Sequence, residues 1–159
     1  MFTNVEIRRM ESFLAQIGVS LIPASSILPA NFPGLDIQWG SVLVDESRVV
    51  HLGDILHEAG HIAVTDPAAR NSLRLIPSGG EELSTMAWSY AAARHLGFGA
   101  NVVFYPESYD NFGNALIENF ESQNYIGLPL MEKWGMTAGL RKAALQNVEP
   151  FPHMLRWLR

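Results

Sequence analysis

Apolar residues recur at helical spacing in three stretches of the chain. The first stretch predicts a helix over Asn4–Ile17, and the second predicts a short helix between Asp54 and Thr65. The third predicts a longer helix over Glu81–Leu96, which Gly97 ends. In the second stretch four residues share an apolar face: Ile55, Ala59, Ile62 and Ala63. We expect Asp54 to cap this helix, because its carboxylate can accept from free N–H groups of the first turn.

Between the first two predicted helices the pattern is that of strands. Asp36–Asp45 and Arg48–His51 are rich in β-branched residues and are separated by the turn-like pair Glu46-Ser47. They predict a β-hairpin that leads into the second helix. Such a strand can take up an extended peptide along its edge, although a hairpin that only completes the core fits equally well. The preceding segment, Val19–Leu35, contains three prolines, which favours an extended, irregular wall or lid of a cleft.

The last third of the chain is less regular. Val102–Tyr105 predicts a short strand closed by Pro106, and Asn114–Glu121 predicts a helix. A final group of large residues most simply packs in the core, with a homodimer contact as the alternative: Trp134, Met136, Phe151, Met154, Trp157 and Leu158. We expect residues 1–159 to form a single α+β domain, in which a small antiparallel sheet or hairpin packs against the second and third helices.

The second helix contains an H-E-x-x-H motif, His57-Glu58-Ala59-Gly60-His61. Histidines at positions i and i+4 lie on one helix face, so both imidazoles can reach one tetrahedral zinc ion. Glu58 is not a ligand in this pattern, but it can accept a proton from water beside the metal. Gly60 is unfavourable inside a helix by roughly 0.8–1 kcal/mol, which indicates close approach of another backbone or a substrate. Two metal-free core histidines are the alternative.

A zinc site in a hydrolase needs a third protein ligand, and the start of the third helix offers two candidates. Glu81 and Glu82 stand 20 and 21 residues after His61. We favour Glu82, because it shares a helix face with Thr85 and Ser89, whose small hydroxyl side chains leave room beside a metal. Glu81 is the alternative ligand. The glutamate that is not a ligand is expected to stabilise the N-terminus of the helix through the helix dipole.

Hydrolysis also requires a hydrogen-bond donor that faces the developing oxyanion. Four residues are candidates by type alone: Tyr90, His95, Tyr105 and Tyr109. Tyr90 fits the core better, because it lies on the apolar face of the third helix. His95 fits a favourable cation at the end of that helix, and neither His51 nor His153 has a partner at ligand spacing.

The motif followed by a Glu-led helix resembles the gluzincin group of zinc metallopeptidases, in particular its compact bacterial members. This resemblance covers His57 to about Ala93, and it implies a zinc site and hydrolysis without implying a substrate. The wider pattern of LHEAGHIAV, EE with AWSYAAA, then GLPL and WGM is similar to a family of small uncharacterised bacterial proteins. The chain departs from better-known gluzincins, because Thr85 and Met86 replace the Asp that follows the third ligand by four residues.

We therefore expect a zinc-dependent hydrolase, most simply a metallopeptidase, in which His57, His61 and Glu82 hold Zn²⁺. Glu58 would act as the general base toward a peptide or protein substrate. The alternative from another class is a non-catalytic protein that holds a structural metal or binds a peptide along the hairpin edge. A regulator that cleaves one cellular partner is a third hypothesis, and it would be inactive on general peptides.

Composition excludes several other classes. The chain has 11 Lys and Arg against 16 Asp and Glu, which argues against a nucleic-acid surface because phosphate binding needs clustered cations. The basic residues near the end are expected on a solvated face: Arg141, Lys142, Arg156 and Arg159. There is no cysteine, so thiolate zinc ligands are excluded. No apolar run approaches the ~20 residues of a membrane span and no signal-peptide pattern is present, so we expect a cytoplasmic protein without a membrane partner.

Overall fold

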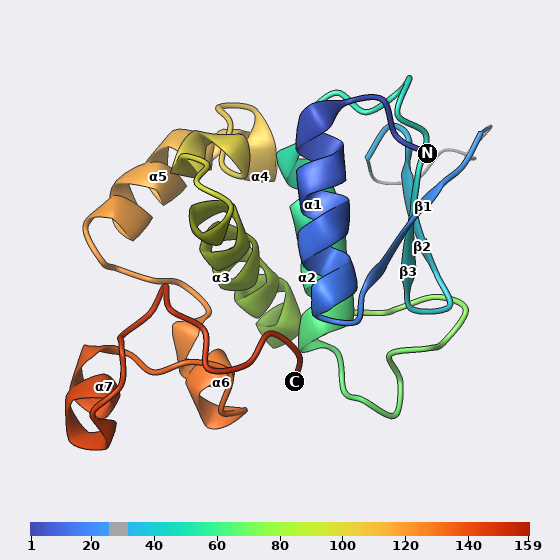
Figure 1. Cartoon of the computed structure of the whole chain (residues 1–159). Coiled ribbons are helices and arrows are strands. Elements are labelled where there is room, and N and C mark those ends of the chain that lie inside the picture. Colours follow the sequence, from blue (N-terminus) through green and yellow to red (C-terminus); the bar gives the residue numbers. More distant parts are fainter. Residues whose placement is uncertain (26–31) are drawn as a thin grey trace.

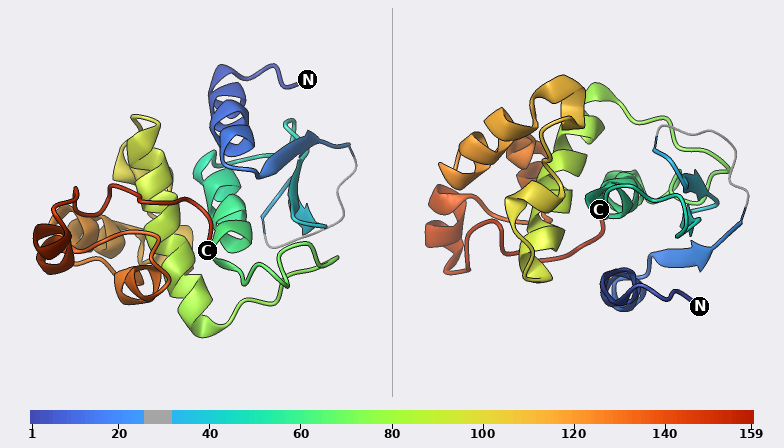
Figure 2. Two further views of the ribbon diagram at one scale, coloured as in Figure 1. Left: turned by 60° about the horizontal axis from the view of Figure 1, so that its bottom comes forward. Right: turned by 90° about the horizontal axis from the view of Figure 1, so that it is seen from above.

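The structure is a computed structural model that describes residues 1–25 and 32–159. Its elements follow in this order: α1 Val5–Gln16, β1 Ser20–Pro23, β2 Leu35–Gln38, β3 Ser41–Val44, α2 Gly53–Val64, α3 Gly79–His95, the 3-10 helix η1 Ala100–Val102, α4 Ser108–Asn111, α5 Gly113–Glu121, α6 Leu128–Lys133 and α7 Leu140–Gln146. Helix α2 lies at the centre, between α3 on one side and the sheet on the other, with α1 alongside (Figures 1 and 2). The fold is α+β, as the sequence predicted.

All twelve residues of α2 are buried, although the sequence predicted one apolar face only. The helix contacts α3 on one side and strands β2 and β3 on the other. Polar residues of the H-E-x-x-H motif are therefore buried together with the apolar ones. Burial of polar groups is unfavourable unless each finds a partner, so the surroundings of this helix decide what its histidines and glutamate do.

Helices α2 and α3 approach each other closely at Gly60. A Cβ atom at this position would lie 2.9 Å from Cγ2 of Thr85 and 3.2 Å from Cε3 of Trp88, both on α3. The close approach predicted for Gly60 is confirmed, and the neighbour is another helix. The missing side chain thus lets α3 bring its own polar residues next to those of α2.

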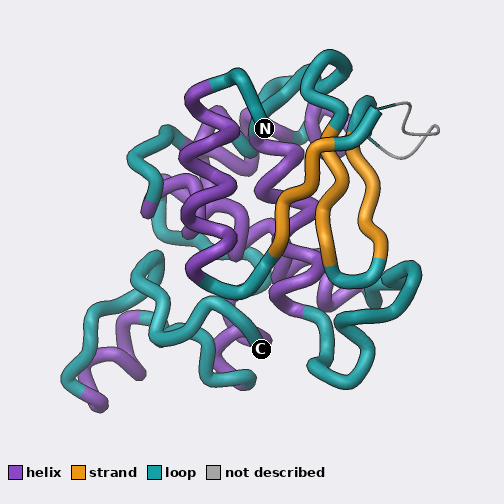
Figure 3. The backbone as a smooth tube through the Cα atoms, turned by 45° about the vertical axis from the view of Figure 1, so that its right-hand side comes forward, coloured by secondary structure: helices purple, strands orange, loops and turns teal. Residues whose placement is uncertain are grey.

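The sheet has three strands in the order β1-β3-β2, and Figure 3 shows them side by side at the edge of the molecule with the helices behind. Strands β2 and β3 are antiparallel, with Leu35 opposite Val44 and Gln38 opposite Ser41. Strand β1 pairs in parallel with β3, which places Ser20 opposite Ser41. The sheet is therefore mixed, because a segment predicted as irregular contributes a strand. The predicted lid includes residues 26–31, which lie outside the described residues.

A hairpin forms, but it lies within Asp36–Asp45, which was predicted as one of its two strands. Trp39 and Gly40 connect β2 to β3 with φ angles of 51° and 70°. Two successive left-handed residues make the tight turn whose twist matches that of antiparallel strands. The prediction that Arg48–His51 is a strand is wrong, since the chain bends there and leads into α2. Gly40 lies inside the segment predicted as one strand. A glycine in such a position indicates an interruption of the strand, and here it marks the turn.

The N-terminal end of α2 differs from the prediction that Asp54 caps it. The helix begins at Gly53, and Asp54 lies in its first turn. Gly53 packs against the backbone of Val102, so closely that a Cβ would lie 1.9 Å from the Val102 carbonyl oxygen. The Asp54 carboxylate instead accepts a hydrogen bond of 3.0 Å from the Tyr105 hydroxyl. Asp54 therefore faces a side chain rather than the helix backbone.

Two arginines donate hydrogen bonds to backbone carbonyls at the C-terminal end of α2. Nε of Arg70 donates to the carbonyl of Ile62 at 3.1 Å, and Nη1 of Arg159 donates to the carbonyl of Val64 at 3.4 Å. The backbone N–H of Arg159 also donates to the carbonyl of Ala63 at 2.9 Å. The last turn of a helix leaves its carbonyl groups without partners inside the helix, and these contacts supply partners. The positive charges of the two arginines also interact favourably with the negative end of the helix dipole. The expectation that Arg159 belongs to a solvated face is wrong.

The C-terminal third is largely helical. The predicted strand at Val102–Tyr105 is absent, since Val102 ends the 3-10 helix η1 and a turn follows it. The predicted helix at Asn114–Glu121 is confirmed by α5. Core packing is confirmed for three of the late apolar residues: Met136, Phe151 and Met154. Within the described parts of the chain, no helix combines the length and apolar character that a membrane span requires.

Substitution of Gly60 by alanine tests the contact between α2 and α3. The added methyl group must displace Thr85 and Trp88, and overpacking of this kind outweighs the higher helix propensity of alanine. We expect Gly60→Ala to lower the free energy of unfolding by about 1–2 kcal/mol in chemical denaturation. Gly79→Ala is the matched control, since no atom lies within 4 Å of its added Cβ and stability should not fall. Equal stability of the two variants would contradict a tight contact.

Candidate metal centre

Two histidines and a glutamate converge where α2 meets the first turn of α3. Nε2 of His57 lies 3.3 Å from Oε1 of Glu82, and Nε2 of His61 lies 3.5 Å from Oε2 of the same carboxylate. One ligand atom from each side chain lies within 4.8 Å of the other two. Both histidines are buried, whereas the Glu82 side chain is 39% exposed. The structure thus brings together the three residues favoured from the sequence.

The spacing of these atoms fits a tetrahedral divalent ion. Metal–ligand bonds of about 2.0–2.2 Å place neighbouring tetrahedral ligand atoms about 3.3–3.6 Å apart. The separations of 3.3 and 3.5 Å fall in this range, each to a different oxygen of Glu82, and one atom from each of the three side chains lies within 4.8 Å of the other two. A set of two histidines and one glutamate also leaves one position for water or substrate. The triad is therefore a candidate metal-binding site of the open kind.

Hydrogen bonds on the far side of each imidazole orient both histidines. Nδ1 of His57 lies 2.8 Å from the Tyr109 hydroxyl, and Nδ1 of His61 lies 3.3 Å from Oγ1 of Thr85. The Thr85 hydroxyl donates to the carbonyl of Glu81 at 2.9 Å, so its oxygen can accept from His61. With both Nδ1 atoms partnered in this way, the Nε2 atoms face Glu82.

The sequence anticipated one of these two partners. Thr85 was predicted beside the metal from its helix face, and it contacts His61. Ser89, predicted in the same way, donates instead to the carbonyl of Met86 at 3.0 Å. Tyr109 was named only as an oxyanion donor, and the structure places its hydroxyl at the Nδ1 atom of His57. No sequence signal connects Tyr109 with His57, because the two residues are 52 positions apart.

An unusual backbone conformation holds Tyr109 in place. Tyr109, Asp110 and Asn111 all have left-handed φ angles, of 52°, 57° and 70°. Residues other than glycine adopt this conformation at a cost of about 1–2 kcal/mol each, so three in succession persist only where surrounding contacts hold them. The Tyr109 ring is partly buried and lies 5.6 Å from the His57 ring. The turn therefore holds Tyr109 beside His57, on one side of the candidate metal centre.

Glu58 lies beside the triad, and only 8% of its surface is exposed. Burial raises the pKa of its carboxyl from 4.5 to about 7, which the nearby His57 partly counteracts. Among the described residues, Glu58 forms no hydrogen bond or ion pair, and its side chain lines the same cleft as the triad. A buried carboxyl group without a partner is free to exchange a proton with a molecule in the cleft.

Two of the three triad residues, His61 and Glu82, are in the ionisation state that metal binding requires at neutral pH. Burial lowers the pKa of His61 to about 4, so its imidazole is neutral and keeps a free lone pair. The pKa of Glu82 is lowered, mainly by its hydrogen bond with His57, so this carboxylate is ionised. The same cluster thus contains one carboxyl held ionised and, at Glu58, one with a raised pKa.

Glu81 occupies a different place from Glu82. Its carboxylate accepts from the backbone N–H of Ser78 at 2.9 Å, while Ser78 Oγ accepts from the backbone N–H of Glu81 at 3.3 Å, which completes a capping box for α3. The other Glu81 oxygen lies 3.3 Å from Nη1 of Arg159. These contacts agree with the role at the helix N-terminus expected for one of the two glutamates. Glu82 as a metal ligand stays a prediction that binding experiments can test.

The remaining sequence candidates lie outside the triad. The Tyr105 hydroxyl donates to Asp54, and its ring stacks on His51 with 3.6 Å between centroids. Tyr90 packs in an aromatic cluster, 4.9 Å from the ring of Phe120, which confirms its core location. The His95 ring lies 5.1 Å from the ring of Phe13 and 5.3 Å from that of Trp157. Of the four candidates, Tyr105 and Tyr109 line the cleft.

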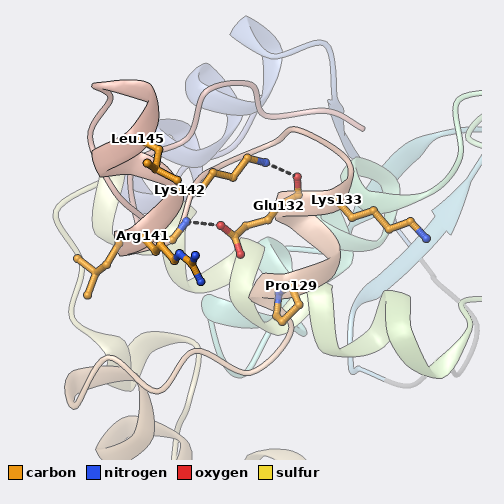
Figure 4. A pocket seen from close by; sticks show the side chains of 8 residues that line it. Pro129, Glu132, Lys133, Arg141, Lys142 and Leu145 are labelled. Atoms are coloured by element: carbon orange, nitrogen blue, oxygen red, sulfur yellow. Dashed lines mark hydrogen bonds between the residues drawn. The ribbon is translucent and has the colours of Figure 1, made fainter.

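The cleft above the triad has a volume of about 340 Å³. Its lining residues come from α2, α3 and the 103–110 segment, together with Phe32: Asp54, His57, Glu58, His61, Glu82, Val103, Tyr105, Glu107, Ser108, Tyr109 and Asp110. A larger hollow lies between α6 and α7, where Figure 4 shows Glu132 next to Lys142 and Arg141. Glu132 already accepts from the backbone N–H of Gly139 at 2.7 Å, and no histidine lines this hollow. Among the described residues, the group of side chains that could hold a metal ion therefore lies in the first cleft and not in this hollow.

Comparison with protein-family models, curated proteins and solved structures finds no match to this chain. The residues of the cleft are therefore the basis of the function proposed below.

The raised pKa of Glu58 predicts a pH-dependent stability of the metal-free protein. Because the folded state binds this proton more tightly than the unfolded state, the stabilisation is present below pH 4.5 and is lost as the pH rises through about 7. Glu58→Gln removes the effect, so the variant should gain up to roughly 3 kcal/mol over the wild type at about pH 8 and little at about pH 4. Denaturation in the presence of a chelator measures the difference. His61 has a lowered pKa and therefore the opposite effect on stability. Because both proteins contain His61, its effect cancels from the difference between them. A difference independent of pH would contradict the raised pKa.

Proposed function

We propose that this protein is a zinc-dependent hydrolase that cleaves peptide or other amide bonds. The observation that carries the proposal is the His57–His61–Glu82 triad at the base of an open cleft, with buried Glu58 beside it. Zinc is the ion that hydrolases hold with two histidines, one glutamate and an open fourth position. When bound, it supplies a Lewis acid that polarises a substrate carbonyl and lowers the pKa of water toward ~7.

The residues of the chain take separate roles in this proposal. His57, His61 and Glu82 hold the ion, while Glu58 removes a proton from the attacking water and returns it to the leaving amine. A carboxylate that is buried in this way is a stronger base than an exposed one. Thr85 and Tyr109 keep the two imidazoles in a fixed orientation, which favours a constant ligand geometry.

A catalytic role is supported over a structural one by the surroundings of the triad. Within the described residues, no fourth histidine or carboxylate joins the three ligand atoms. Structural zinc sites are usually closed by four protein ligands, whereas this triad faces a cleft. The alternative considered from the sequence, a non-catalytic metal or peptide-binding protein, does not require a carboxyl group with a raised pKa beside the triad, whereas a general base does.

The neighbouring sheet supports a peptide as the substrate. Among the described strands β2 pairs only with β3, so its other edge can accept the backbone of an extended chain. Strand β2 contacts α2, and the charge of Asp36 on β2 reaches Glu58 and raises its pKa slightly. A peptide added along β2 would therefore pass beside the metal centre.

Zinc affinity of two neighbouring variants tests the ligand set. Glu82→Gln should weaken zinc binding by more than about 100-fold, since loss of a group that only orients a ligand already costs 10–100-fold. Glu81→Gln is the matched control, because it makes the same charge change one residue away and should stay within about threefold of the wild type. Competition with a chromophoric chelator gives both dissociation constants. The reverse order would make Glu81 the ligand and contradict the proposed set.

Turnover of Glu58→Gln tests the general base. We expect this variant to retain zinc with wild-type stoichiometry and to lose about 10²–10⁴-fold in kcat, because proton transfer by a positioned carboxylate contributes about that much. Cleavage of a mixture of proteome-derived peptides, followed by mass spectrometry, provides the measurement. A zinc-loaded wild type that binds peptides without cleaving any of them would support the binding protein instead.

A further inference from the structure

The cleft above the metal centre carries a large excess of negative charge. Five carboxylates line it: Asp54, Glu58, Glu82, Glu107 and Asp110. No lysine or arginine is among the described residues that line the cleft, and the sequence of residues 26–31 contains neither. The remaining lining groups are neutral or histidine. A substrate that enters this cleft thus meets acidic groups with no basic residue among them.

A divalent ion would not remove this excess. Its two positive charges offset Glu82 and the partly ionised Glu58, which leaves three more carboxyl groups: Asp54, Glu107 and Asp110. Asp54 is buried and accepts from Tyr105, whereas Glu107 and Asp110 are exposed at the rim. Neither of these two rim residues forms a hydrogen bond or ion pair with the described residues. Their charges are therefore available to a ligand.

The rim carboxylates have a defined position. Asp110 is the middle residue of the left-handed turn, and Tyr109 next to it is anchored by its hydrogen bond to His57. Glu107 stands three residues earlier, on the other side of buried Ser108. A charge held by the same segment that orients a metal ligand lies at a constant distance from the reacting centre. Such fixed charges select between substrates more effectively than charges on a mobile loop.

Two further features indicate that the cleft receives a ligand. Glu58 is more than nine-tenths buried, has no partner among the described residues, and lines the cleft, so its oxygens can accept from a bound molecule. The Phe32 ring also lines the cleft, edge-on to the His57 ring at 5.5 Å, and provides an apolar surface. The cleft thus combines an apolar contact, an unpaired acceptor and an acidic rim.

We propose that this cleft selects peptides that carry lysine or arginine beside the scissile bond, with the cationic side chain facing Glu107 and Asp110. The inference rests on the proposed hydrolase function and adds the substrate class. Long basic side chains suit this arrangement, because their aliphatic stems contact apolar surface while their charged ends reach the rim. Acidic peptides are disfavoured by repulsion from the same carboxylates.

Zinc-anchored peptide hydroxamates test this selectivity by binding, independently of turnover. Two compounds are compared on zinc-loaded protein by calorimetry, identical except that the two residues next to the hydroxamate are lysines in one and glutamates in the other. The lysine compound should bind about tenfold tighter at low salt, and the preference should shrink at high salt. In the double variant Glu107→Gln/Asp110→Asn the ratio should fall to within about threefold. Asparagine tolerates the left-handed conformation of residue 110, so the turn should persist.

A second double variant controls for overall charge. Glu118→Gln/Glu121→Gln on α5 changes the net charge by the same amount, and neither residue lines the cleft. This control should keep the full preference for the lysine compound. Equal affinities for the two hydroxamates, or an equal loss of preference in both double variants, would overturn the inference while zinc binding still stands. A chain that binds no zinc would overturn the proposed function, and the inference with it.

Discussion

The close contact between α2 and α3 at Gly60 is the constraint on which the metal centre depends. Only a residue without a side chain lets Thr85 and Trp88 approach to within contact distance of the α2 backbone. This approach places Glu82, one turn earlier on α3, within 3.5 Å of the His61 imidazole. It also completes the burial of α2, whose other side is covered by the sheet. The geometry of the candidate site is therefore a consequence of how two helices pack.

Burial on all sides gives the carboxyl groups of the cleft different properties. Glu82 faces two imidazoles and stays ionised, whereas Glu58 has no partner among the described residues and holds its proton to a pH of about 7. Different environments thus assign different chemical roles to residues of the same type, one as a candidate ligand and one as a candidate base. A chain that placed both glutamates at the surface would lose this distinction, because water would equalise their pKa values.

The 103–110 segment couples the metal centre to the entrance of the cleft. Tyr109 holds the His57 imidazole from behind, and Asp110 next to it presents a charge at the rim. Both depend on a left-handed turn that no local preference of the sequence favours strongly, although Asp and Asn tolerate it better than most residues. The unfavourable backbone is maintained by the packing of the partly buried tyrosine ring and by its hydrogen bond. One strained turn therefore contributes to ligand orientation and, in our proposal, to substrate choice.

The sequence by itself determined the helices that carry the ligands and the residues that project from one face. The i, i+4 spacing of His57 and His61 and the helix face of Glu82 follow from the geometry of a single helix, which local sequence dictates. Only the tertiary structure decided which groups surround them. Tyr109 reaches His57 from 52 residues away, Arg159 closes the end of α2, and β1 joins the sheet in parallel with β3. Such contacts depend on how segments that are distant in sequence are placed relative to one another. Packing of the whole core sets this placement, and the local periodicity of the sequence does not encode it.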